Sequence, residues 1–217
     1  MMHQSARRLA TFHGIDRRQG IIMKRTTLVL TLALAAGCLP RTPPPSLHTL
    51  DMTPSGTARP NHNIDVDRLR PSEALGRKDI LIMKSSTAVE YYKLAQWASN
   101  LGEIVPEKLE AEFGEDLQGR DTVLISGTIL GFGLADLPKG GHEAQIKLDL
   151  AFRWDGESLY DTPLLKRVYE LNLPVESGSA GDLCKALSRG LETIAAQIAE
   201  DVNGLPEKQP RRPKGAS

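Results

Sequence analysis

The chain has 217 residues, with 27 lysines and arginines, 27 aspartates and glutamates, and two cysteines. This length is enough for one domain with a hydrophobic core. Six of the 27 cations but only one of the 27 carboxylates precede residue 38, so the remainder, with 21 cations and 26 carboxylates, is mildly acidic. That charge argues against a nucleic-acid binder, whose surface is strongly basic.

The first element is a secretory signal peptide. Lys24 and Arg25 precede a short apolar run from Thr26 to Gly37, and this order is typical of export signals. A permanent membrane span needs roughly 20 apolar residues, more than this run provides. Because Met23 stands directly before the two cations, we expect residues 1–22 to be an over-long gene start and residues 1–37 to lie outside the fold.

Cys38 stands where such a signal would be cleaved. The preceding Leu34-Ala35-Ala36-Gly37 resembles the bacterial lipobox, although Ala35 takes the position where leucine is commoner. In that motif the cysteine thiol receives a lipid, such as palmitate, and becomes the new N-terminus. The alternative is an ordinary signal peptide with an incidental cysteine. The proline-rich segment that follows is expected to be extended and semi-rigid. We therefore predict lipidation at Cys38, with residues 38–45 as a tether.

Alternating apolar residues predict several strands in the first half of the folded region, residues 46–204. We expect a strand from Ser46 to Met52, a loop, a half-buried strand from Ile64 to Leu69, and a hairpin of residues 79–83 and 88–93 that Trp97 closes. Residues 98–115 have a helical pattern. Since proline is accepted in the first turn of a helix but breaks its interior, Pro106 predicts that the firm helix begins near Ile104.

The second half predicts a larger sheet and a long helix. Glycines in and directly after the strand from Thr122 to Phe132 indicate a bulge or a bend, and the strict alternation from Ala144 to Trp154 is the clearest strand pattern. Asp155-Gly156 favours a tight hairpin turn, so the return strand should run from Glu157 to Val175, interrupted near Pro163. Apolar residues at spacings of three and four predict an amphipathic helix from Ala180 to Asn203, ended by Gly204, and residues 205–217 are expected to be a disordered tail. The fold class is therefore α+β: one domain, a mostly antiparallel sheet, and two main helices on one face.

The sequence contains no recognisable catalytic or metal-binding motif. His48, His62 and His142 are isolated, and neither a nucleophile elbow nor a phosphate-binding glycine loop is present. Cys184 falls in the apolar stripe of the last helix and is expected to be a small buried hydrophobe. We predict a protein without cofactor, metal or enzymatic activity. A secreted hydrolase assembled from distant residues is the alternative.

Several segments carry a resemblance to a known family. They are the lipobox at Cys38, His48-Thr49-Leu50, Gly76-Arg77-Lys78-Asp79-Ile80-Leu81, Val89-Glu90-Tyr91-Tyr92-Lys93-Leu94-Ala95-Gln96-Trp97-Ala98, and the helix from Leu183 to Leu191. From Ser46 to Gly204 the chain resembles the ABC-type transport auxiliary lipoprotein family (paraquat-inducible protein C-like). His48, where the family more often has tyrosine, and the glycine-rich strand at 127–133 depart from its pattern.

The resemblance implies a non-catalytic domain tethered in the periplasm. Its partners would be an MCE-domain protein and an ABC permease/ATPase complex that move lipids between membranes. A homo-oligomer is a further alternative for its own assembly. Tyr91, Tyr92 and Trp97 are candidate partner contacts, or they fill the core. Leu39, rather than aspartate, after the acylated cysteine favours the outer membrane. The alternative function is that of a structural or assembly lipoprotein of that membrane.

Overall fold

Strand β6 (Thr122–Asp136) is the centre of an eight-stranded mixed sheet. The computed structural model describes residues 43–54, 60–67 and 69–208, so the predicted signal peptide and Cys38 lie outside the described residues. In chain order the elements are β1 (Ser46–His48), β2 (Asn63–Val66), β3 (Arg70–Pro71), the 3-10 helix η1 (Glu73–Leu75), β4 (Asp79–Met83), β5 (Val89–Trp97), α2 (Leu101–Phe113), β6 (Thr122–Asp136), β7 (His142–Trp154), β8 (Leu165–Val175) and α3 (Ala180–Asn203).

The two edges of β6 are used differently. Along one edge it pairs with β7 over its whole length in antiparallel register, and β8 continues this meander. Along the other edge it receives β2, β3 and β4 one after another, all parallel. β5 then pairs antiparallel with β4, and β1 pairs parallel with β5. The longest ladders are antiparallel as predicted, whereas the parallel additions were not expected.

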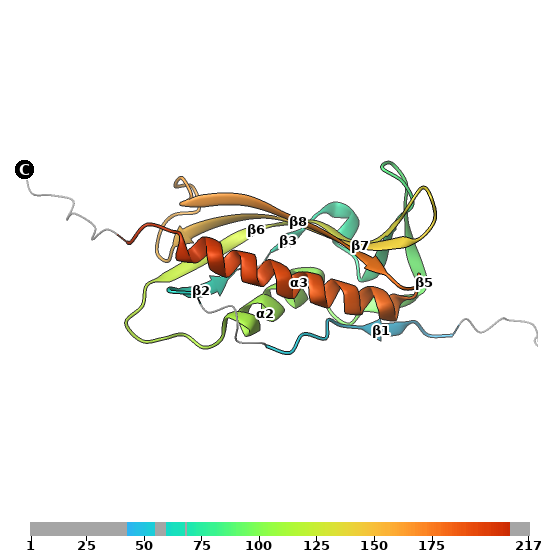
Figure 1. The fold of residues 1–217 in the computed structure, drawn as a ribbon, viewed down its shortest axis with the longest axis horizontal. Coiled ribbons are helices and arrows are strands. Elements are labelled where there is room, and N and C mark those ends of the chain that lie inside the picture. The colour runs from blue at the N-terminus through green and yellow to red at the C-terminus, as the bar shows by residue number, and fades with distance from the viewer. Residues whose placement is uncertain (1–42, 55–59, 68, 209–217) are drawn as a thin grey trace, which may run out of the picture. The chain divides into compact units, whose positions relative to one another are not determined.

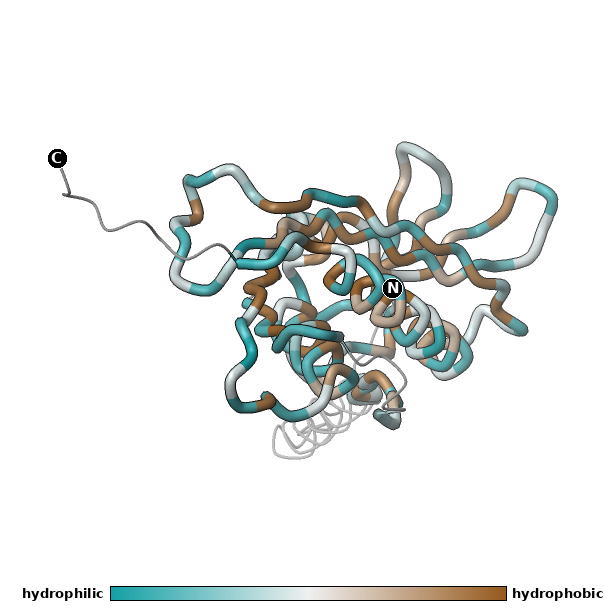
Figure 2. The backbone as a smooth tube through the Cα atoms, turned by 60° about the vertical axis from the view of Figure 1, so that its left-hand side comes forward, coloured by the Kyte–Doolittle hydropathy of each residue, from teal (hydrophilic) through white to brown (hydrophobic). Residues whose placement is uncertain are grey.

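Helices α2 and α3 cover one face of the sheet (Figure 1). The predicted apolar stripe of α3 is confirmed, because Leu183, Leu187, Leu191 and Ile198 are completely buried. Beneath them the even-numbered residues of β7 from Ala144 onward are buried and most odd-numbered ones are half-buried, and Figure 2 shows the matching change between apolar and polar positions along the strands. A strand with one face on a core has this alternation. The α+β class and the single helical layer are thus as the sequence predicts.

The start of α2 differs from the prediction. Asn100 caps the helix, and its side-chain oxygen accepts a hydrogen bond of 2.9 Å from the backbone N–H of Gly102. Because asparagine is among the best N-cap residues and Leu101 is buried, the helix begins at Leu101 rather than near Ile104. Pro106 therefore lies inside the helix, where its missing N–H leaves one backbone carbonyl without a helical donor.

The return strand also begins later than predicted. Gly156 has a φ of 82°, as a left-handed turn residue should, yet residues 155–164 form a loop and β8 starts only at Leu165. The carbonyl oxygen of Asp161 lies 3.4 Å from Nε of Arg153, and the N–H of Leu164 donates to the carbonyl of Phe152 at 2.9 Å. These bonds hold the loop against β7. The predicted turn at Asp155-Gly156 forms, since the N–H of Glu157 donates to the carbonyl of Trp154 at 3.1 Å, but the return strand does not follow it directly.

The first strands are shorter than predicted. β1 ends at His48, after which the chain runs on against the helical layer: Leu50 and Met52 are buried, and the backbone N–H of Asp51 donates to Oγ of Ser188 in α3. The strand expected from Ile64 to Leu69 is β2, which ends at Val66. Tertiary contacts with α3, rather than strand pairing, explain the apolar pattern of residues 50–52.

The bulge predicted in β6 is confirmed by a register shift between Ile129 and Gly131. Beyond it, Gly133 lies so close to β4 that a Cβ atom there would be 2.5 Å from the carbonyl oxygen of Leu81. Any side chain at this position would push β4 away. Gly133 thus allows the parallel strand β4 to approach closely.

Candidate functional site

Tyr91 and Tyr92, two of the predicted partner contacts, are half-buried in β5 and hydrogen-bonded to different segments. The hydroxyl of Tyr91 donates to the carbonyl of Ala74 in η1 at 3.0 Å, and the guanidinium of Arg77 lies 4.8 Å from the centre of its ring. The hydroxyl of Tyr92 donates to the carbonyl of Gly178, just before α3, at 2.8 Å. Both rings join segments of the fold and expose only part of their surface.

Trp97 belongs to the core. It has no exposed surface, and its ring centre lies 5.8 Å from that of Phe132. Among the described residues its Nε1 has no hydrogen-bond acceptor. Trp97 therefore offers a partner no surface in this structure, and the interpretation of this residue as a core filler fits its position. The three aromatic residues do not form one contact surface.

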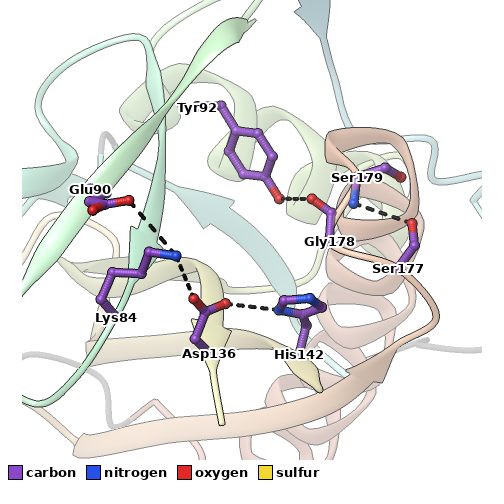
Figure 3. A network of polar contacts seen from close by, with 8 residues as sticks. All are labelled: Lys84, Glu90, Tyr92, Asp136, His142, Ser177, Gly178 and Ser179. Carbon is purple, nitrogen blue, oxygen red and sulfur yellow. Dashed lines mark hydrogen bonds and ion pairs between the residues drawn. The ribbon is translucent and has the colours of Figure 1, made fainter. Parts of the chain in front are cut away.

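Tyr92 lies in a polar cluster at one end of the sheet (Figure 3). We call it the hairpin-end cluster, and its residues are Lys84, Glu90, Tyr92, Asp136, His142 and Gly178. Asp136 Oδ2 lies 2.7 Å from Nζ of Lys84, and Asp136 Oδ1 lies 2.8 Å from Nδ1 of His142. Lys84 is also 3.8 Å from Glu90. The cluster joins the β4–β5 hairpin, the β6–β7 hairpin and the segment that enters α3.

Lys84 and Asp136 each stabilise the charged form of the other. The hydrogen bond from Lys84, followed by that from His142, lowers the pKa of the Asp136 carboxyl below its ordinary value. The same contact raises the pKa of the Lys84 ammonium. Burial raises the pKa of Tyr92 to about 12. At neutral pH the lysine and the aspartate are therefore fully charged and the tyrosine is a neutral hydrogen-bond donor.

The cluster has the geometry of a clamp. A Cβ atom on Gly178 would lie only 3.0 Å from Nε2 of His142, so the backbone of residue 178 lies close to the ring nitrogen that Asp136 leaves available. The arrangement holds three chain segments together at the end of the sheet.

Sequence reasoning missed most of this cluster. It treated His142 as isolated, but Asp136 and His142 are cross-strand partners that flank the Lys139-Gly140-Gly141 turn. Counting outward from that turn could have found the pair. Lys84 could not have been found in this way, because it enters through the parallel pairing of β4 with β6.

Two further observations bound the chemistry. Within the described residues no group of three histidine, cysteine, aspartate or glutamate side chains is arranged to hold a metal ion. Cys184 is buried, and this burial raises the pKa of its thiol to about 11. A thiol held in its neutral form is a poor nucleophile.

In the described part of the chain, no helix has the length and apolar character needed to cross a membrane.

The fold is similar to those of solved structures. One is the crystal structure of an uncharacterised protein, with a TM-score of 0.54 and 18% identity over 74% of this chain and 99% of that one. Another is that of protein XCC0632 from Xanthomonas campestris, described as belonging to the family DUF330, with a TM-score of 0.56 and 13% identity over 70% of this chain and 90% of that one. The likeness shows a shared fold. No family model and no curated protein matches the sequence.

Proposed function

We propose that this protein is a lipid-anchored, non-catalytic component of the bacterial envelope that acts as an auxiliary part of an ABC/MCE-type transport system, in lipid movement between membranes. The observation that carries the proposal is Cys38 at the end of an export signal, followed at once by a proline-rich tether and a folded domain. The resemblance of residues 46–204 to the auxiliary lipoprotein family supplies the transport partner.

The exposed surfaces of the domain suit a part that works by contact with other proteins. The helices cover only one face of the sheet. On the other face, β7 and β8 present side chains joined by cross-strand ion pairs, Lys147 with Glu170 at 2.6 Å and Lys166 with Asp149 at 3.3 Å. Such a polar sheet face can meet a partner without rearrangement of the core.

The anchor is tested by growing cells with a clickable palmitate analogue and recovering the protein. We expect the label on the wild type and on Cys184→Ala, and its complete loss in Cys38→Ser. The Cys184 variant is the matched control, because it removes the other cysteine of the chain. Label that persists in Cys38→Ser would refute lipidation at this residue. Fractionation of the same cells should find the wild type in the outer membrane, and recovery from the inner membrane would contradict that location.

The partner is tested by cross-linking in whole cells, followed by purification of the tagged chain. We expect an MCE-domain protein or an ABC permease to be recovered with it. The alternative, a structural or assembly lipoprotein of the outer membrane, predicts β-barrel or cell-wall components instead. Recovery of those components without a transporter would overturn the transport proposal and leave the anchor intact.

A further inference from the structure

The sheet face opposite the helices contains a cavity of about 300 Å³ near the 155–164 loop. We call it the outer-face cavity. Its floor is made by small residues of neighbouring strands, since Ser126 of β6 lies opposite Ala151 of β7, which in turn lies opposite Lys166 of β8. Leu159 of the loop forms one wall. A volume of this size is at the lower end of those that bind small molecules.

Cations from three strands line the cavity: Arg70 of β3, Arg153 of β7 and Lys166 of β8. The registers bring them to one place, because Arg70 pairs with Thr128 and Thr128 pairs with Asp149. Two carboxylates, Asp67 and Asp149, also line it. Asp149 is bound to Lys166, whereas neither arginine forms an ion pair within the described residues. The cavity thus has more positive than negative groups.

Arg153 is the most informative of these residues, because only 9% of its surface is exposed. Its Nη1 lies 3.3 Å from Oγ of Ser126 and its Nε 3.4 Å from the carbonyl oxygen of Asp161. Both contacts are long and go to uncharged oxygens, although a guanidinium has five N–H donors. A buried charge is costly unless it is paired. An anion in the cavity would supply the missing partner.

We propose that the outer-face cavity binds a phosphate group, with Arg70 and Arg153 as its cationic ligands and Ser126 and Thr128 as its hydroxyl donors. The planar fork of an arginine matches the spacing of phosphate oxygens, and arginine is the preferred residue for such recognition. The phosphate has two sources, a free ion and the diester of a phospholipid headgroup. This inference rests on the cavity alone and does not depend on the transport proposal.

The rim of the cavity bears on the choice between the two sources. Leu159 is 55% exposed, and the next residue, Tyr160, is fully exposed. An apolar side chain at the wall of a cationic cavity, followed in the chain by an exposed aromatic residue, suits a ligand with an apolar part next to its phosphate. A free phosphate ion would make no use of them.

The test is isothermal titration of the whole chain in neutral detergent, at fixed ionic strength, with inorganic phosphate and with glycerophosphoglycerol, a soluble phosphodiester headgroup. We expect saturable binding of at least one of them. Arg153→Gln and Arg70→Gln should each weaken it by about tenfold, the effect of losing one charge-assisted hydrogen bond. Tighter binding of the diester would identify a lipid headgroup as the source, and tighter binding of the ion would identify free phosphate.

The matched control is Lys147→Gln. Lys147 lies on the same face of β7 and is bound to Glu170 rather than to the cavity, so this variant loses the same charge and should bind within about twofold of the wild type. An equal loss in Lys147→Gln would mean non-specific attraction and overturn the proposal, as would no saturable binding of either ligand. If the buried Arg153 variant does not fold, the exposed Arg70 variant decides. Binding unchanged in Arg70→Gln would then refute the site.

Discussion

Replacing Tyr169 with phenylalanine removes one oxygen from a buried contact between β8 and the end of α3. Tyr169 is 2% exposed, and its hydroxyl donates to Oδ2 of Asp201. Arg167 donates to the other oxygen of the same carboxylate, so Asp201 keeps a charged partner in the variant. The ring and its apolar burial are unchanged. The free energy of unfolding should therefore fall by the contribution of one hydrogen bond to a charged group, about 1.5–3 kcal/mol at pH 7.

This contact also predicts how stability depends on pH. Burial, followed by the hydrogen bond to Asp201, raises the pKa of Tyr169 above its ordinary value of 10.0. A raised pKa means that the folded state holds the phenol proton more tightly than the unfolded chain does. The contribution of Tyr169 is therefore complete below pH 10 and is lost as the pH rises above it. The free energy of unfolding of Tyr169→Phe should therefore not fall above pH 10 from this cause. Tyr92 and Cys184 still titrate in the variant and lower its stability as they do in the wild type.

The assay is urea unfolding of the two proteins at pH 7 and pH 11, followed by circular dichroism. The free energy of unfolding of the variant should be lower at pH 7, and the difference should shrink at pH 11. Two results would refute the reasoning: a variant as stable as the wild type at pH 7, or a difference that stays constant between the two pH values. The second would mean that Tyr169 is not held as a neutral donor in the fold.

Three further predictions concern the strands, the helix caps and the hairpin-end cluster, each checked by urea unfolding of the whole chain. Gly133→Ala should lower the free energy of unfolding by about 1–3 kcal/mol, because its methyl group would meet the carbonyl of Leu81; Gly181→Ala, which meets no atom within 4 Å, should be neutral or stabilising by up to about 1 kcal/mol. Asn100→Ala should lower it by about 1 kcal/mol through loss of the α2 cap, and an unchanged midpoint would contradict that role. The lowered pKa of Asp136 means that its contribution is complete above its ordinary pKa and is lost as the pH falls through the folded value; Asp136→Asn should therefore unfold with a weaker pH dependence below pH 4.

The elements with strong local patterns could be predicted from the sequence, and the long-range pairings could not. The stripe of α3 and the alternation of β7 are periodic over many residues, so their faces and bounds are close to those observed. The start of α2 was misjudged because Pro106 was given more weight than the cap at Asn100. The strand was predicted from Glu157 on, although β8 begins only at Leu165. The apolar residues Leu159 and Tyr160 suggested a strand with one buried face, but both are exposed in the structure.

The same division applies to the candidate site. The pair of Asp136 and His142 follows from the symmetry of one hairpin, whereas the approach of Lys84 and of the Gly178 carbonyl depends on tertiary structure. The arginines of the outer-face cavity come from strands that are distant in sequence, and the registers of β3 on β6 and of β6 on β7 bring them together. Lipidation at Cys38 stays a prediction of the sequence.

The parallel addition of β2, β3 and β4 along one edge of β6 also sets an order of folding. These strands precede β6 in the chain but have no sheet partner along that edge until β6 exists. By contrast, β6, β7 and β8 form a local meander, which closes short loops and forms quickly. As the chain is made from its N-terminus, β2 and β3 therefore have no sheet partner until β6 has been released, and during that interval their apolar residues must be kept from aggregation.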